Sequence, residues 1–222
     1  MMSWENDFVA RLSQVQLGDV FNPYADRCQV HDLPNAPAIR SSNLATVIRE
    51  RHAAHVDSIW FGRDLGYRGG RRTGLALTDE VRMLEESSDD HMFVKATKGS
   101  IVGERTAAVI WSVIGRMRCA PFLWNAFPFH PHQPDSQFTN RAHSVSERRA
   151  TVWAIEDLIT HFDNPRLIAI GKDASKALKE LGFAHDSVRH PSYGGQREFI
   201  AQIEKLYGLP PIMGDAREAI LL

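Results

Sequence analysis

Short runs of apolar residues alternate along this chain with longer stretches in which apolar residues recur every three or four positions. Runs that are apolar on both faces predict strands buried in a parallel sheet, and they lie at 56–62, 120–127, 166–171 and 187–190. The stretches with helical spacing predict helices at 1–17, 39–55, 78–86, 104–117, 144–164, 172–182 and 195–208. Because strands and helices alternate, we expect a three-layer α/β/α sandwich with a central, mainly parallel four-stranded sheet.

Local signals set the ends of several helices. Thr78 is expected to cap the helix that follows it, and Ser144 with Glu147 forms an S-x-x-E capping box. The Asn-Pro pair at 164–165 ends the long helix, and Gly182 closes the next one.

The size and composition of the chain indicate one soluble domain. Its 222 residues are enough for one sizeable core and few for two, so we expect a single domain over 1–222. Within it, 1–55 is expected to be an N-terminal helical extension and 56–207 the catalytic core. A net charge of −1 excludes a generally basic protein that coats nucleic acid but leaves room for a local basic patch.

The chain shows no sign of a membrane or of an oxidising compartment. No window approaches the roughly 20 apolar residues of a membrane span, and the acidic N-terminal stretch is unlike a signal peptide. The two cysteines, Cys28 and Cys119, cannot supply a four-thiolate metal or iron–sulfur site and are expected to be reduced. We therefore expect a cytoplasmic, monomeric protein.

The most unusual segment is a glycine-rich loop, GRDLGYRGGRRTG at 62–74, directly after the first predicted strand. It matches neither the phosphate-binding P-loop nor the dinucleotide fingerprint. Its five glycines allow close approach of the main chain to a ligand, and Asp64 is its one acid. Its four arginines suit phosphate groups: Arg63, Arg68, Arg71 and Arg72.

The other strands also end in polar residues. Asn125 ends the second strand, a loop rich in histidine and proline follows at 128–134, and His190 ends the fourth strand. In a parallel sheet the carboxyl ends of the strands share one edge, where ligands bind. We therefore expect Asp64, Asn125 and His190 to lie near one another.

Two other kinds of site are open to these residues. His130 and His132 could form a metal pair, with a third ligand from Asp135, His143 or His190. A Ser-His-Asp triad would use Ser192, His190 and Asp64, but the chain lacks the G-x-S-x-G nucleophile elbow there.

Three motifs in order, GRDLGYRGGRRTGLALTDE, LWNAFPFHPH and RHPSYGG, resemble the uracil-DNA glycosylase superfamily over roughly residues 57–200. The resemblance implies hydrolysis of the N-glycosidic bond of a flipped deoxyuridine. It makes Asp64 the residue that activates water and His190 the one that faces uracil O2, and it pairs Asn125 with uracil O4 and N3.

The resemblance extends to the rest of the site. The residues expected to bind the substrate are Gly62, Arg63, Gly66, Tyr67, Leu77, Asn125 and Phe127. Those expected to bind DNA are Arg68, Arg71, Arg72, Ser192, Tyr193, Gln196 and Arg197.

This chain departs from the superfamily's pattern in three places. Leu77 stands where a phenylalanine usually stacks on uracil, which leaves Phe127 or Phe129 to supply the ring. Gly66 stands where a tyrosine excludes the methyl group of thymine in one branch. The leucine that wedges into the duplex is absent, so Tyr193, Gln196 or Arg197 has to take its place.

We expect a glycosylase that needs no cofactor and no metal. It should be monofunctional, because the motifs contain no lysine for a Schiff base. Its partner is uracil-containing DNA. The alternatives are the same fold acting on deaminated purines or mismatched thymine, a non-catalytic DNA-binding protein, and a metal-dependent hydrolase that uses the histidine loop.

Overall fold

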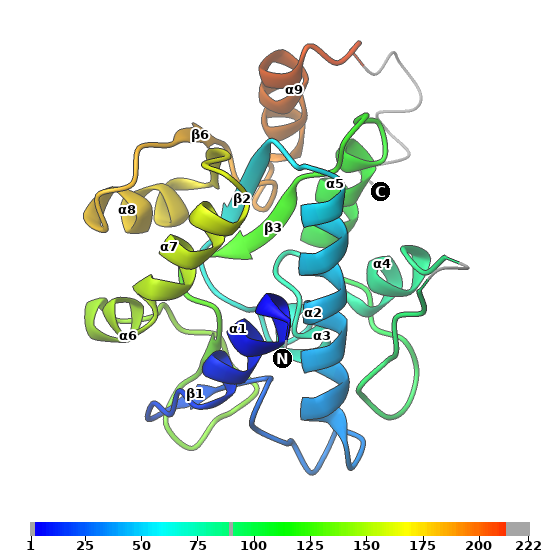
Figure 1. Ribbon diagram of the computed structural model, residues 1–222, viewed down its shortest axis with the longest axis vertical. Helices are drawn as coiled ribbons and strands as arrows, with labels where there is room; N and C mark the ends of the chain where they lie inside the picture. The colour runs from blue at the N-terminus through cyan, green and yellow to red at the C-terminus, as the bar shows by residue number, and fades with distance from the viewer. Residues whose placement is uncertain (1–2, 89–90, 212–222) are drawn as a thin grey trace.

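A four-stranded parallel sheet forms the centre of the molecule in the computed structural model, which describes residues 3–88 and 91–211 (Figure 1). The strands lie in the order β3-β2-β5-β6, and every neighbouring pair is parallel. They are β2 (Ser58–Gly62), β3 (Phe122–Asn125), β5 (Arg166–Ile170) and β6 (Asp186–Val188). The predicted sheet and its place in an α/β/α sandwich are confirmed.

Helices cover both faces of this sheet because its strands are apolar on both sides. One face packs on α1 (Trp4–Ser13), α2 (Ala36–Ala53), α7 (Val152–His161) and α8 (Lys172–Glu180), and the other packs on α5 (Arg105–Ile114) and α9 (Gln196–Tyr207). Alternate residues serve the two faces: Ile59 and Phe61 of β2 point to the first core, and Trp60 points to the second.

Several elements differ from the sequence prediction. A short antiparallel pair, β1 (Val20–Phe21) with β4 (His130–Pro131), was not expected. The cap of α4 (Glu80–Glu85) is Asp79, whose carboxylate accepts from the Arg82 amide, so the prediction of Thr78 is wrong. The Ser144–Glu147 capping box is confirmed, but the long helix is interrupted at Thr151 and forms α6 (Val145–Ala150) and α7.

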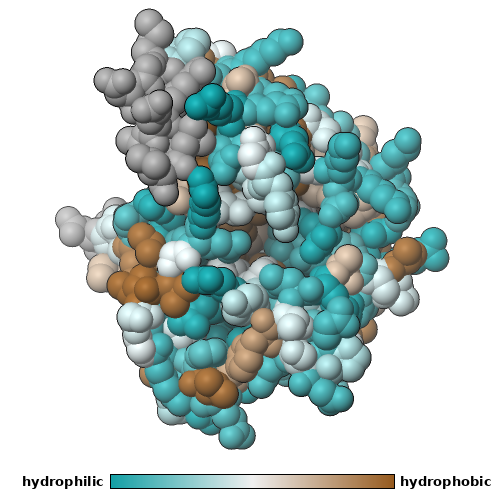
Figure 2. Space-filling model, turned by 180° about the vertical axis from the view of Figure 1, so that it is seen from behind, coloured by the Kyte–Doolittle hydropathy of each residue, from teal (hydrophilic) through white to brown (hydrophobic). Residues whose placement is uncertain are grey.

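The face of the molecule opposite the view of Figure 1 is mainly hydrophilic. Seen from behind, it carries only small, separate hydrophobic patches (Figure 2). Within the described ranges, no helix is both long and apolar enough to cross a membrane. The two cysteines are free thiols, as expected.

The sheet register determines where the polar strand ends meet. Gly62, the last residue of β2, lies opposite Asn125, the last residue of β3. The loop after β2 is then fixed to the segment after β3, because the Leu65 amide donates to the Phe129 carbonyl at 3.0 Å and His130 Nδ1 contacts the Leu65 carbonyl at 2.7 Å. Since a carbonyl only accepts, His130 donates this bond through Nδ1–H.

The burial of His130 predicts acid sensitivity of the fold. Burial is the main reason that the pKa of His130 falls from 6.5 to about 4. Between these values the unfolded chain binds a proton that the folded chain does not, so the free energy of unfolding should fall as pH falls, by up to about 1.4 kcal/mol per pH unit from this group. His130→Asn keeps a donor for Leu65 and should flatten this dependence in urea unfolding between pH 7 and pH 4.5. His132→Asn, a change in the same loop, is the control, and equal slopes for both variants would contradict the assignment.

Candidate active site

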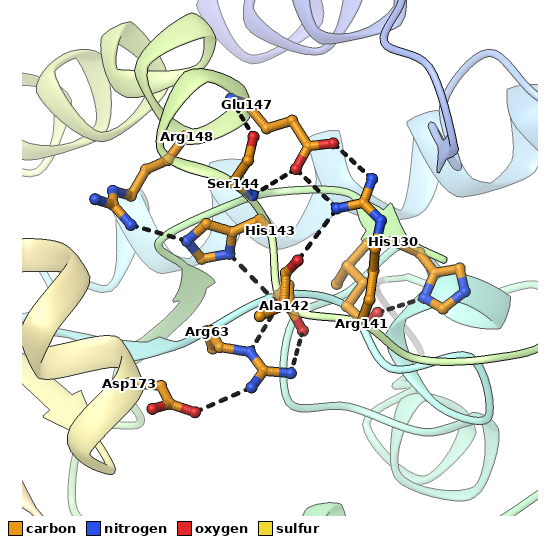
Figure 3. Close-up of polar contacts among 11 residues, drawn as sticks. Arg63, His130, Arg141, Ala142, His143, Ser144, Glu147, Arg148 and Asp173 are labelled. Carbon is orange, nitrogen blue, oxygen red and sulfur yellow. Dashed lines mark hydrogen bonds and ion pairs between the residues drawn. The ribbon is translucent and has the colours of Figure 1, made fainter. Parts of the chain in front are cut away.

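Asp64 lies two residues after the end of β2, next to Arg63, whose side chain and contact with Asp173 are drawn in Figure 3. Its side chain is 7% exposed, and its Oδ2 accepts a 2.7 Å bond from Arg63 Nε. Arg63 is in turn held by Asp173 at the start of α8, with 3.0 Å between Nη1 and Oδ2. The carboxylate is thus held in place, while its Oδ1 has only a 3.4 Å contact with Arg63 Nη2.

His143 is a member of this site that the sequence suggested only as one possible metal ligand. Its side chain is 3% exposed, and its Nδ1 lies 3.4 Å from Asp64 Oδ2. Its Nε2 lies 3.2 Å from Arg148 Nη1, and Arg148 also pairs with Glu180. The capping box at Ser144 could have drawn attention to this residue, because it fixes the chain just after His143.

Asn125 presents a buried amide that nothing in the described protein satisfies. The residue is 1% exposed, and neither its Nδ2 nor its Oδ1 has a hydrogen-bond partner. The amide lies against Gly62 so closely that a Cβ on Gly62 would be 2.3 Å from Oδ1. The same Cβ would lie 2.9 Å from Cδ2 of Leu77. The side chains of Leu77 and Asn125 therefore meet over Gly62, which has no side chain of its own.

His190 follows β6 in a tight loop. The Ser192 amide donates to its Nδ1 at 3.1 Å, and Ser192 Oγ lies 2.7 Å from the same nitrogen. Because an amide only donates, the neutral ring carries its proton on Nε2. Burial and then the charges of Arg189 and Arg63 lower the pKa of His190, and the charge of Asp173 opposes them. His190 therefore remains neutral to a lower pH than an ordinary histidine.

Two of the predicted DNA contacts are wrong. Residues 70–73 form a helical turn, α3 (Gly70–Thr73), which directs Arg71 and Arg72 into the protein. Arg71 is 1% exposed, and its guanidinium lies 4.0 Å from the centre of the Phe21 ring. Arg72 pairs with buried Glu80 at 3.2 Å. Both guanidinium groups are therefore unavailable to phosphates at the surface.

Phe127, predicted to contact the substrate, is enclosed in the structure. Its ring is fully buried, with its centre 5.5 Å from that of Phe129 and 5.3 Å from that of His143. Phe129 is fully buried too, so neither ring lines an open pocket. Phe127 instead supports His143 from behind.

The remaining predicted contacts are exposed or half-buried, and we call them the rim residues. Arg68 and Arg197 are exposed, and Tyr193 is 98% exposed with a left-handed backbone (φ 51°). The other rim residues are half-buried: Gly66, Tyr67, Ser192 and Gln196. The Ser192 hydroxyl, expected to bind a phosphate, faces His190 instead.

The alternative metal site does not assemble. In the part of the chain that the structure describes, no three His, Cys, Asp or Glu side chains are grouped so that they could hold a metal ion. His130 is instead engaged with the Leu65 carbonyl.

Comparison with known proteins identifies the fold. Neither the known family models nor the curated proteins contain a match to this sequence. Among solved structures, the chain is similar to wild-type SMUG2 of Pedobacter heparinus, with a TM-score of 0.63. The match covers 94% of this chain and 98% of the other at 13% sequence identity. At this identity the likeness shows a shared fold.

The inward turn of α3 predicts that the arginines of the glycine loop differ in their effect on stability. Arg72→Ala should lower the free energy of unfolding by about 3 kcal/mol, because it leaves Glu80 buried without its cation. Arg68→Ala should change it by less than about 0.5 kcal/mol, because Arg68 is exposed. Urea unfolding of both variants measures this, and equal stabilities would contradict the structural role of Arg72.

Proposed function

We propose that this protein is a DNA glycosylase that hydrolyses the N-glycosidic bond of a flipped-out deoxyuridine, releasing uracil and leaving an abasic site. The likeness to Pedobacter heparinus SMUG2 supports a DNA glycosylase on this fold. Uracil as the substrate rests on the side chains at the strand ends.

The observation that carries this proposal is the unpaired amide of Asn125. A buried polar group without a partner costs about 1–3 kcal/mol, so native proteins keep such groups rarely and for a reason. An asparagine amide offers one donor face and one acceptor face side by side. Uracil presents the complementary pair, with O4 as acceptor and N3–H as donor, whereas cytosine presents a donor and an acceptor in the opposite order. A base that reaches this amide displaces the Leu77 side chain that lies beside it.

Asp64 and His190 each stabilise one of the two charges that develop as the bond breaks. Loss of the base leaves positive charge on the sugar and negative charge on uracil. The Asp64 carboxylate, with Oδ1 weakly occupied, stabilises the sugar cation and orients or deprotonates a water molecule. The Nε2–H of neutral His190 donates to the oxyanion developing at O2, as in an oxyanion hole. This chemistry uses no metal and no cofactor.

The rim residues bind the DNA. We assign phosphate contacts to Arg68 and Arg197, and insertion into the duplex to Tyr193, whose ring stands free of the protein. Flipping a base costs a few kcal/mol, and a side chain that fills the gap offsets part of that cost. Gly66 has no side chain, and a Cβ there would lie 3.9 Å from Glu104 Oε1, so this position of the glycine loop stays open.

The role of Asp64 predicts a specific kinetic defect. Asp64→Asn should lower the single-turnover rate of uracil release by about 10²-fold or more, because the lost charge acts in the transition state. Binding of an abasic duplex should change little. The measurement is alkaline cleavage of a labelled uracil duplex after excess enzyme is added. A variant that releases uracil at the wild-type rate would remove Asp64 from the mechanism.

The role of Asn125 predicts a change in the base that is released. Asn125→Asp should slow uracil release at least tenfold, since a carboxylate cannot donate to O4, and should improve the ratio of cytosine to uracil release. Wild type and variant are compared on duplexes that contain uracil, cytosine, hypoxanthine or a G·T mismatch. Wild type should prefer uracil. A variant with unchanged uracil release, or a wild type that prefers hypoxanthine or mismatched thymine, would contradict the assignment.

A further inference from the structure

A continuous series of contacts joins Asp64, His143, Arg148 and Glu180, and Figure 3 shows His143 beside Arg148. Asp64 Oδ2 lies 3.4 Å from His143 Nδ1, His143 Nε2 lies 3.2 Å from Arg148 Nη1, and Arg148 pairs with Glu180. His143 and Arg148 are each less than 10% exposed in their side chains, at 3% and 7%. Bulk water therefore contributes little to the orientation of these groups.

The arginine determines which nitrogen of His143 carries the proton. A guanidinium group has donors and no acceptor, so its contact with His143 requires a lone pair on Nε2. The neutral ring must then hold its proton on Nδ1, the nitrogen that faces Asp64. Nδ1 makes no hydrogen bond with any described residue, and Asp64 Oδ2 lies within ion-pair distance of it. The 3.4 Å separation is long for a hydrogen bond, and such catalytic contacts often shorten when a substrate binds.

Helix α8 anchors both sides of this arrangement. Its first turn provides Asp173, which holds Arg63, and its last turn provides Glu180, which holds Arg148. Arg63 and His143 both approach Oδ2 of Asp64, so the carboxylate is fixed by one oxygen and keeps Oδ1 for the reaction.

We propose that His143 is a positioning residue for Asp64. It acts as a neutral Nδ1–H donor whose tautomer is locked by Arg148, and it orients the carboxylate through Oδ2. This inference rests on the proposed role of Asp64 in glycoside hydrolysis. In this role His143 differs from His190, which faces the departing base, and it does not act as a metal ligand.

The test is a double-mutant cycle measured as single-turnover uracil release. His143→Phe keeps an aromatic ring against Phe127 and removes the donor, and it should slow release about tenfold. His143→Asn places an amide donor near the position of Nδ1 and should restore most of the rate. In an Asp64→Asn background, His143→Phe should have no further effect, because its action passes through the carboxylate. His132→Phe, in the histidine and proline loop at 128–134 that precedes His143, changes a histidine without contact with Asp64 and is the control.

The outcomes separate this inference from the function itself. If wild type releases uracil and Asp64→Asn releases it more slowly, but His143→Phe lowers the rate about tenfold in both backgrounds or His143→Asn fails to restore the rate, positioning through Asp64 is overturned. A second measurement needs neither substrate nor variant: ¹⁵N chemical shifts of the imidazole in the wild-type protein should show a protonated Nδ1 and a bare Nε2 for His143. The opposite tautomer would overturn the proposal whatever the substrate is. A wild type inactive on uracil DNA, with the expected tautomer, would contradict only the function.

Discussion

The close contact between the Asn125 amide and the backbone of Gly62 is the constraint on which the proposed site depends. The parallel register places these two residues opposite each other at the ends of neighbouring strands. Any side chain at position 62 would collide with Oδ1, so the backbone there stays bare and the chain can turn at once into the loop that carries Asp64. One strand pairing thus brings the amide and the acid to the same edge of the sheet.

The arginines in and around the glycine loop and the proposed site have two different roles. Arg40, Arg71 and Arg72 are buried and hold the glycine loop and the N-terminal region together, with Arg40 bonded to the Arg72 carbonyl and paired with Asp32. Arg63 and Arg148 lie beside the proposed catalytic groups and fix the orientation of Asp64 and His143. The chain has 26 Lys and Arg residues. Because most arginines of the glycine loop have partners within the protein, few of them are left to bind a phosphate backbone.

The sequence was sufficient to predict the sheet, because continuous apolar runs between amphipathic stretches admit few arrangements other than a doubly covered parallel sheet. The same logic predicted that Asp64, Asn125 and His190 follow strand ends. It could not predict the direction of Arg71 and Arg72, since their partners Phe21 and Glu80 come from other parts of the chain and only the turn of α3 aims the side chains at them. Nor could it predict that Phe127 is enclosed, or that Arg148 selects the tautomer of His143, because both depend on tertiary packing.

The central claim is that the unpaired amide of Asn125 is kept for a uracil base. The most direct measurement is a crystal structure of the Asp64→Asn protein with a duplex that contains one deoxyuridine. We predict an extruded uracil whose O4 and N3 lie within hydrogen-bond distance of Asn125 Nδ2 and Oδ1, with Leu77 moved from Gly62 and His190 Nε2 facing O2. A flipped uracil bound elsewhere, with the Asn125 amide still unpaired beside Leu77, would contradict it.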